Sequence, residues 1–184
     1  PIGDLSDIPN LTWRDSSGAV NVNPLSWVPD TMDAISLDYA YPMKSVIRDR
    51  DMMSYLPIKD WLSYPVSASL TSRGCKRNCV TCGGSAEAYR NHFCRRTTAW
   101  RDPQLLIRDI ETIQKHIPGP IFVLNDFLMA GKDYTEEFIT GLKGKLRNPI
   151  GFEFFGPPEE GEDLYKLLNA NLKDWSVEIS AESH

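Results

Sequence analysis

Three cysteines with the spacing C-x3-C-x2-C, at Cys75, Cys79 and Cys82, are the residues best suited to chemistry. Cysteine thiolates bind soft metals, and this spacing lets a single loop supply all three ligands. A structural zinc site closes with four protein ligands, whereas a 4Fe-4S cluster held by three cysteines leaves one iron able to bind a small molecule. We therefore predict a three-cysteine iron–sulfur site with these residues as its ligands.

Zinc is the alternative metal. Cys94 follows the triplet and could complete a four-cysteine site, although neither a second C-x2-C pair nor an H-x3-5-H pair accompanies it. In that case the chain would be a zinc-stabilised, non-catalytic binding module that uses Cys75, Cys79, Cys82 and Cys94.

The triplet and its flanking residues resemble the radical S-adenosylmethionine (radical SAM) enzymes. The wider match runs from Thr71-Ser72-Arg73-Gly74 before the first cysteine to Gly83-Gly84-Ser85 after the third, and it is similar to the subset whose radical domain follows a cobalamin-binding domain. Many members have an aromatic residue before the third cysteine, where this chain has Thr81. The resemblance implies that the free iron of a 4Fe-4S cluster chelates S-adenosylmethionine. Reductive cleavage of S-adenosylmethionine then gives methionine and a 5′-deoxyadenosyl radical. The resemblance does not identify the substrate on which this radical acts.

The same resemblance implies partners. A reducing electron donor such as flavodoxin or ferredoxin would supply the electron. Cobalamin is expected only in a longer protein and not on this segment, because none of His92, His116 and His184 has the neighbours of a D-x-H-x-x-G signature.

The elements that would position these residues alternate between strands and helices from residue 66 onward. We expect strands over residues 66–71, 121–124, 150–155 and 175–180, with helices between them. The first helix should begin at Asp102-Pro103, and the next should begin with a capping box formed by Asp133 and Glu136. Such βαβ units predict an α/β fold with parallel strands. By the resemblance, this would be a partial (βα) barrel of radical SAM type with about four of six units, leaving an open strand edge at 175–180 through which the chain could self-associate.

Polar residues near the strand ends are the remaining candidates for cofactor binding. Active sites of such folds lie at the carboxyl ends of the strands. Two glycines after the third cysteine could also let the backbone approach a cofactor, although they are equally typical of a turn. Glu153 could equally serve in a salt bridge, and period 2 places Glu178 and Ser180 on one face. The predicted cofactor-binding residues are Gly83, Gly84, Asn125, Asp126, Glu153, Glu178 and Ser180.

Composition and charge indicate the domain division, the partners and the cellular compartment. Residues 1–65 hold seven of the thirteen prolines and are expected to form an N-terminal arm, with a small hairpin around Gly18, before a barrel domain over 66–184. Residues 73–101 carry a net charge of +6 in a chain of net charge −5, which suits an acidic partner, a negatively charged cluster or a solvated loop. A nucleic-acid partner is expected only for the zinc alternative, in which the basic stretch would contact it, because aromatic residues do not interleave with the basic ones as they do in single-strand binding. No apolar stretch suggests a membrane span, and clustered thiols favour the cytoplasm.

Overall fold

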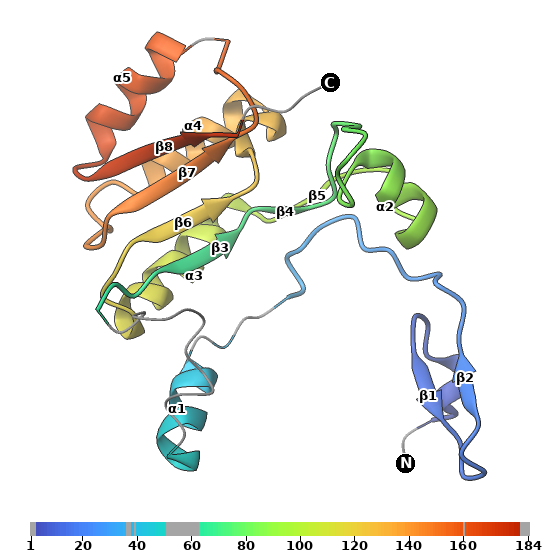
Figure 1. Ribbon diagram of the computed structural model, residues 1–184. Coiled ribbons are helices and arrows are strands. Elements are labelled where there is room, and N and C mark those ends of the chain that lie inside the picture. The colour runs from blue at the N-terminus through green and yellow to red at the C-terminus, as the bar shows by residue number, and fades with distance from the viewer. Residues whose placement is uncertain (1–2, 36–37, 39, 51–62, 160, 181–184) are drawn as a thin grey trace. The chain divides into compact units, whose positions relative to one another are not determined.

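The computed structural model describes residues 3–35, 38, 40–50, 63–159 and 161–180. The chain folds into two units, and each unit is made of segments that are separated in the sequence (Figure 1). The first comprises the residues up to Asp30 together with residues 74–99, and the second comprises residues 31–73 and those from Trp100 onward. The expected division into an arm over 1–65 and a domain over 66–184 stays a prediction.

A four-stranded parallel sheet forms the centre of the second unit. Its strands are β3 (Ser67–Leu70), β6 (Ile121–Leu124), β7 (Ile150–Phe154) and β8 (Trp175–Ile179), paired in that order. Helices α3 (Pro103–His116), α4 (Lys132–Gly141) and α5 (Gly161–Asn171) connect successive strands. The predicted α/β fold with parallel strands is therefore confirmed. In the part of the chain that the structure describes, the sheet is open.

One face of the sheet packs against these helices. Phe127, which follows β6, lies at the centre of this core, with its ring centroid 5.3 to 5.5 Å from those of Phe138, Phe152 and Phe154. The opposite face is more exposed, and Leu70 on it is 44% exposed. Residues of this second face are therefore accessible near the carboxyl ends of the strands.

Helix capping agrees with the sequence at one helix and differs at another. The Asp102 carboxylate accepts hydrogen bonds from the first turn of α3, and Pro103 occupies that turn, as predicted. The predicted capping box of Asp133 and Glu136 is wrong. Helix α4 begins at Lys132 after Gly131, and it has no side-chain cap. Asp133 lies inside its first turn, where a side chain cannot serve as the N-cap.

In the first unit, a β-hairpin forms as predicted. Strands β1 (Thr12–Arg14) and β2 (Val20–Val22) pair antiparallel, and Gly18 has a φ of 87° in the turn. A short 3-10 helix, η1 (Leu5–Asp7), precedes the hairpin.

Two helices and two short strands were not predicted. Helix α2 (Ala86–Phe93) follows the cysteine triplet in the first unit, and α1 (Ala40–Asp49) lies within the expected N-terminal arm. The short strands β4 (Ser72–Arg73) and β5 (Ala99–Trp100) form a two-stranded sheet.

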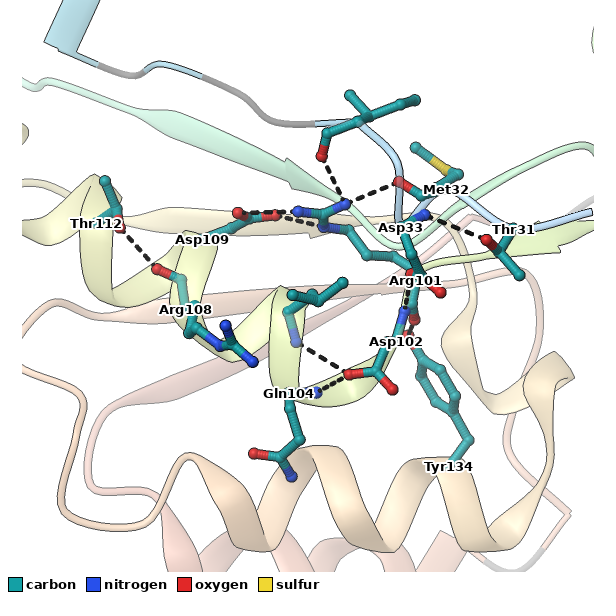
Figure 2. Close-up of polar contacts among 12 residues, drawn as sticks. Thr31, Met32, Asp33, Arg101, Asp102, Gln104, Arg108, Asp109, Thr112 and Tyr134 are labelled. Atoms are coloured by element: carbon teal, nitrogen blue, oxygen red, sulfur yellow. Dashed lines mark hydrogen bonds and ion pairs between the residues drawn. The ribbon is translucent and has the colours of Figure 1, made fainter. Parts of the chain in front are cut away.

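A buried arginine, Arg101, links residues 31–35 to α3 through hydrogen bonds and an ion pair (Figure 2). The Arg101 guanidinium pairs with the Asp109 carboxylate and donates to the carbonyl oxygens of Met32 and Ile35, at 2.8 and 3.0 Å. The Tyr134 hydroxyl donates to the Arg101 carbonyl at 2.7 Å, and burial raises the pKa of Tyr134, so this donor stays protonated. Arg101 therefore satisfies two backbone carbonyls and one carboxylate at a buried position.

Among the described helices, none combines the length and the apolar character that crossing a membrane requires.

Candidate metal and cofactor site

The three predicted metal ligands lie in one loop of the first unit, which begins at Gly74 directly after β4. Cys75 is half-buried, Cys79 is buried and Cys82 is exposed. The backbone N–H of Cys82 donates to the Cys79 carbonyl at 3.2 Å, which forms a tight turn between these two ligands. Gly74 has a φ of 109°, a left-handed conformation that favours glycine at the entry to the loop.

Two of these sulfurs already accept backbone hydrogen bonds. The Arg77 N–H donates to Cys75 Sγ and the Gly84 N–H donates to Cys82 Sγ, each at 3.3 Å. Within the described residues, however, no three Cys, His, Asp or Glu side chains are gathered closely enough to hold a metal ion. The donor set thus suits an iron–sulfur cluster in chemistry and in number, and the loop would have to draw its sulfurs together to hold one.

Cys94, the fourth ligand of the zinc alternative, lies at the other end of α2. It is exposed and forms the C-cap of that helix, with a φ of 52°. In the described part of the chain, it belongs to no group of metal-binding side chains.

The two glycines after the triplet stand in open surroundings. A Cβ added at Gly83 would meet nothing within 4 Å, and one added at Gly84 would come no closer than 3.7 Å, to Cys82 Sγ. Neither residue has the positive φ that would require glycine. Gly83 is therefore open to the surface, and Gly84 is in ordinary van der Waals contact with its neighbours.

In the second unit, several predicted residues come together at the carboxyl ends of the parallel strands. The Asn125 side-chain amide donates to the carbonyl and hydroxyl oxygens of Ser72, at 3.0 and 3.3 Å. The Asn125 backbone N–H donates to Glu153 Oε2 at 3.1 Å, and the Ser180 hydroxyl donates to Glu153 Oε1 at 3.4 Å. We call Ser72, Asn125, Glu153 and Ser180 the polar row, because their hydrogen bonds run from the end of β3 across β6 and β7 to β8.

Asn125 forms the bend of this row. Its φ of 70° is left-handed, a conformation that asparagine tolerates better than most residues. This conformation accompanies a backbone N–H that points to Glu153 and a side chain that reaches Ser72. Sequence reasoning missed Ser72 as a member of the row, and a hydroxyl residue directly after the first strand was the available signal.

Asp126 and Glu178 lie outside the polar row. The Asp126 carboxylate is buried and caps the 3-10 helix η2 (Phe127–Ala130) through the Leu128 N–H, and it also accepts the Phe155 N–H, each bond at 3.1 Å. Its role in the structure is therefore to hold two backbone segments. Glu178 is exposed, and it pairs in register with Glu153 on the more exposed face of the sheet.

The basic window around the cysteines is mostly on the surface of the protein. Arg90 and Arg96 are exposed, whereas Arg95 is buried and donates to the Pro29 carbonyl at 2.9 Å. Val80, in the turn between the second and third cysteines, is 93% exposed. The loop therefore presents an apolar side chain within a basic stretch of the chain.

Searches against protein-family models, curated proteins and solved structures found no match to this chain.

Proposed function

We propose that this chain is part of a radical SAM enzyme in which Cys75, Cys79 and Cys82 hold a 4Fe-4S cluster. The observation that carries the proposal is the placement of all three cysteines in one loop, which follows the parallel strand β3 and the short strand β4 in the chain, with two sulfurs accepting backbone N–H bonds. When bound, the cluster would supply one-electron reduction of S-adenosylmethionine to methionine and a 5′-deoxyadenosyl radical. As part of the same proposal, the parallel sheet belongs to a partial (βα) barrel of radical SAM type.

The chain's own residues would bind and orient the cofactor. The polar row offers the half-buried Glu153 carboxylate at the edge of the sheet where ligands of α/β folds bind. Asp126 would contribute indirectly, by fixing the segment after β6 that carries Asn125.

The partners belong to the same proposal. An acidic electron carrier such as flavodoxin or ferredoxin would be attracted to the basic stretch around the cysteines. A cytoplasmic setting would keep the thiols reduced. Cobalamin would be a partner only through a further domain of a longer protein.

The test is anaerobic reconstitution with iron and sulfide. We expect about four irons and four sulfides per chain, a brown colour, and 5′-deoxyadenosine after addition of dithionite and S-adenosylmethionine. Cys75→Ala, Cys79→Ala and Cys82→Ala should each abolish cluster assembly, because each removes one of only three protein ligands. Cys94→Ala should retain full iron content.

The zinc alternative predicts a different result. A colourless protein with one zinc per chain, lost equally in all four cysteine variants, would contradict the iron–sulfur proposal and support a four-cysteine structural site.

A further inference from the structure

A pocket of about 460 Å³ lies at the amino ends of the parallel strands, whereas the polar row lies at their carboxyl ends. This volume is in the range of small-molecule binding sites. The walls come from the segments that precede the four strands of the sheet and from the first residues of β6, β7 and β8. The proposed iron–sulfur function does not use this pocket.

Close packing and hydrogen bonds hold the walls of the pocket in place. The Asn148 side-chain amide donates to the carbonyl oxygens of Ile117 and Gly119, at 2.7 and 2.8 Å. Gly119 packs directly on the Pro65 carbonyl, because a Cβ at Gly119 would lie 1.5 Å from that oxygen. The loop between α3 and β6 and the segment before β3 are therefore joined around the pocket.

Two aromatic rings give the pocket an apolar surface. Phe122 pairs in register with Gly151, and a Cβ at Gly151 would come within 2.9 Å of the Phe122 ring. The ring therefore lies over Gly151, which is buried, while Phe122 itself is half-buried and lines the pocket. Tyr64, which is 62% exposed, adds the second ring to the lining. The face of an aromatic ring attracts a cation as well as an apolar group.

The charge of the lining favours a cation. Among the described residues that line the pocket, Asp174 is the one charged residue, and the neighbouring Lys173 does not line it. The Asp174 carboxylate is exposed and makes no hydrogen bond or ion pair within the described part of the chain. It is therefore available to pair with a ligand.

The backbone of the lining offers few donors to an anion. Proline supplies a carbonyl oxygen and no N–H group. Four prolines line the pocket, namely Pro65, Pro118, Pro120 and Pro149. The lining therefore combines acceptors, aromatic rings and one carboxylate.

We propose that this pocket binds a small organic amine in its protonated form, with the apolar body of the amine on Phe122 and its ammonium group beside Asp174. A carboxylate and an aromatic face both attract a positive charge. The pocket is thus a second ligand site, at the opposite ends of the strands from the polar row, and it does not depend on an iron–sulfur cluster.

Three probes with the same phenyl body and different charges test the proposal on the 184-residue chain without added metal. They are phenethylamine, phenethyl alcohol and hydrocinnamate. Isothermal titration calorimetry measures each dissociation constant, and amide chemical shifts locate the site. We expect the amine to bind about three- to tenfold more tightly than the alcohol, and the anion to bind most weakly. The shifts should fall on residues 119–122, 150–151 and 174–176.

Asp174→Asn removes the negative charge at an exposed position, so the fold should be retained. It should weaken binding of the amine about threefold or more and leave binding of the alcohol unchanged. Asp133→Asn, at an exposed position of α4 outside the pocket lining, is the matched control and should change neither. Phe122→Leu should weaken binding of both probes, because it removes the ring that both contact.

Several results would overturn the proposal. These are no binding of the amine at millimolar concentration, equal affinity for the amine and the alcohol, equal amine affinity of Asp174→Asn and the unmodified chain, or amide shifts confined to residues outside the pocket. None of them bears on the iron–sulfur proposal, since every measurement is made without a cluster.

Discussion

Arg101 concentrates several interactions in one side chain. It is 5% exposed, its guanidinium pairs with Asp109, and it satisfies the carbonyls of Met32 and Ile35 (Figure 2). Paired buried charges add little net stability, but removal of one partner leaves an uncompensated charge at a buried position. The sequence indicated only that a basic residue precedes the helix, because its carboxylate partner lies eight positions further along the chain.

Arg101→Met should therefore lower the free energy of unfolding by about 3 to 5 kcal/mol. Urea unfolding followed by circular dichroism measures this. Arg108→Met, at an exposed position of the same helix, is the matched control and should change stability by about 0.5 kcal/mol or less. The double variant Arg101→Met with Asp109→Leu should recover part of the loss. Equal stability of Arg101→Met and Arg108→Met would contradict a buried ion pair.

At the scale of elements, the aspartate that holds a helix start is not the one that the sequence predicted. Asp126 is buried and accepts N–H groups from Leu128 and Phe155, whereas Asp133 caps nothing at the start of α4. Asp126→Ala should cost about 1 to 3 kcal/mol, because two partly buried N–H groups lose their acceptor. Asp133→Ala should be nearly neutral. Thermal unfolding of both variants checks this, and the reverse order would restore the predicted capping box.

The hairpin has a pH dependence set by Asp15. Hydrogen bonds from the side chains of Ser17 and Asn21 lower the pKa of Asp15 below its ordinary value of 3.8, and the Ala19 and Ser17 N–H groups add to this. Because the folded pKa is the lower one, the stabilisation is present above pH 3.8 and is lost as the pH falls through the folded pKa.

Amide exchange at Ala19 should therefore accelerate as the pH falls from about 5 to about 2, after correction for the intrinsic rate. Asp15→Asn should abolish this additional dependence, and Asp4→Asn, which alters η1 instead, should preserve it. A hairpin whose protection does not respond to acid in the unmodified chain would show that the Asp15 contacts do not stabilise the turn.

Local sequence signals predicted the elements that depend on neighbouring residues. Apolar runs bounded by proline and glycine placed β6 and β7, and Asp102-Pro103 placed the start of α3. They missed α2, whose start depends on Ser85 directly after the cysteine turns, and α1, which lies in a proline-containing stretch. The candidate site was predicted as separate strand-end residues, because the hydrogen bonds that join Asn125 to Ser72 and Glu153 link positions 53 and 28 residues apart.

At the scale of the whole molecule, contacts between copies of the chain are expected at β8, an edge strand of the described sheet. In the part of the sheet that the structure describes, β3 and β8 are the two edge strands, and Ile179 on β8 is 44% exposed. An edge strand presents N–H and C=O groups that can pair with another chain. We expect concentration-dependent self-association through β8, measured by sedimentation velocity over a range of protein concentrations.

Ile179→Lys should weaken this association, because a charged side chain at an edge strand opposes pairing with a second copy. Val22→Lys, at a 73% exposed position of the hairpin, adds the same charge to the first unit and should leave the association unchanged. A strictly monomeric chain in which residues 174–180 are protected from amide exchange would contradict this expectation, since protection without association requires that the same chain covers the β8 edge.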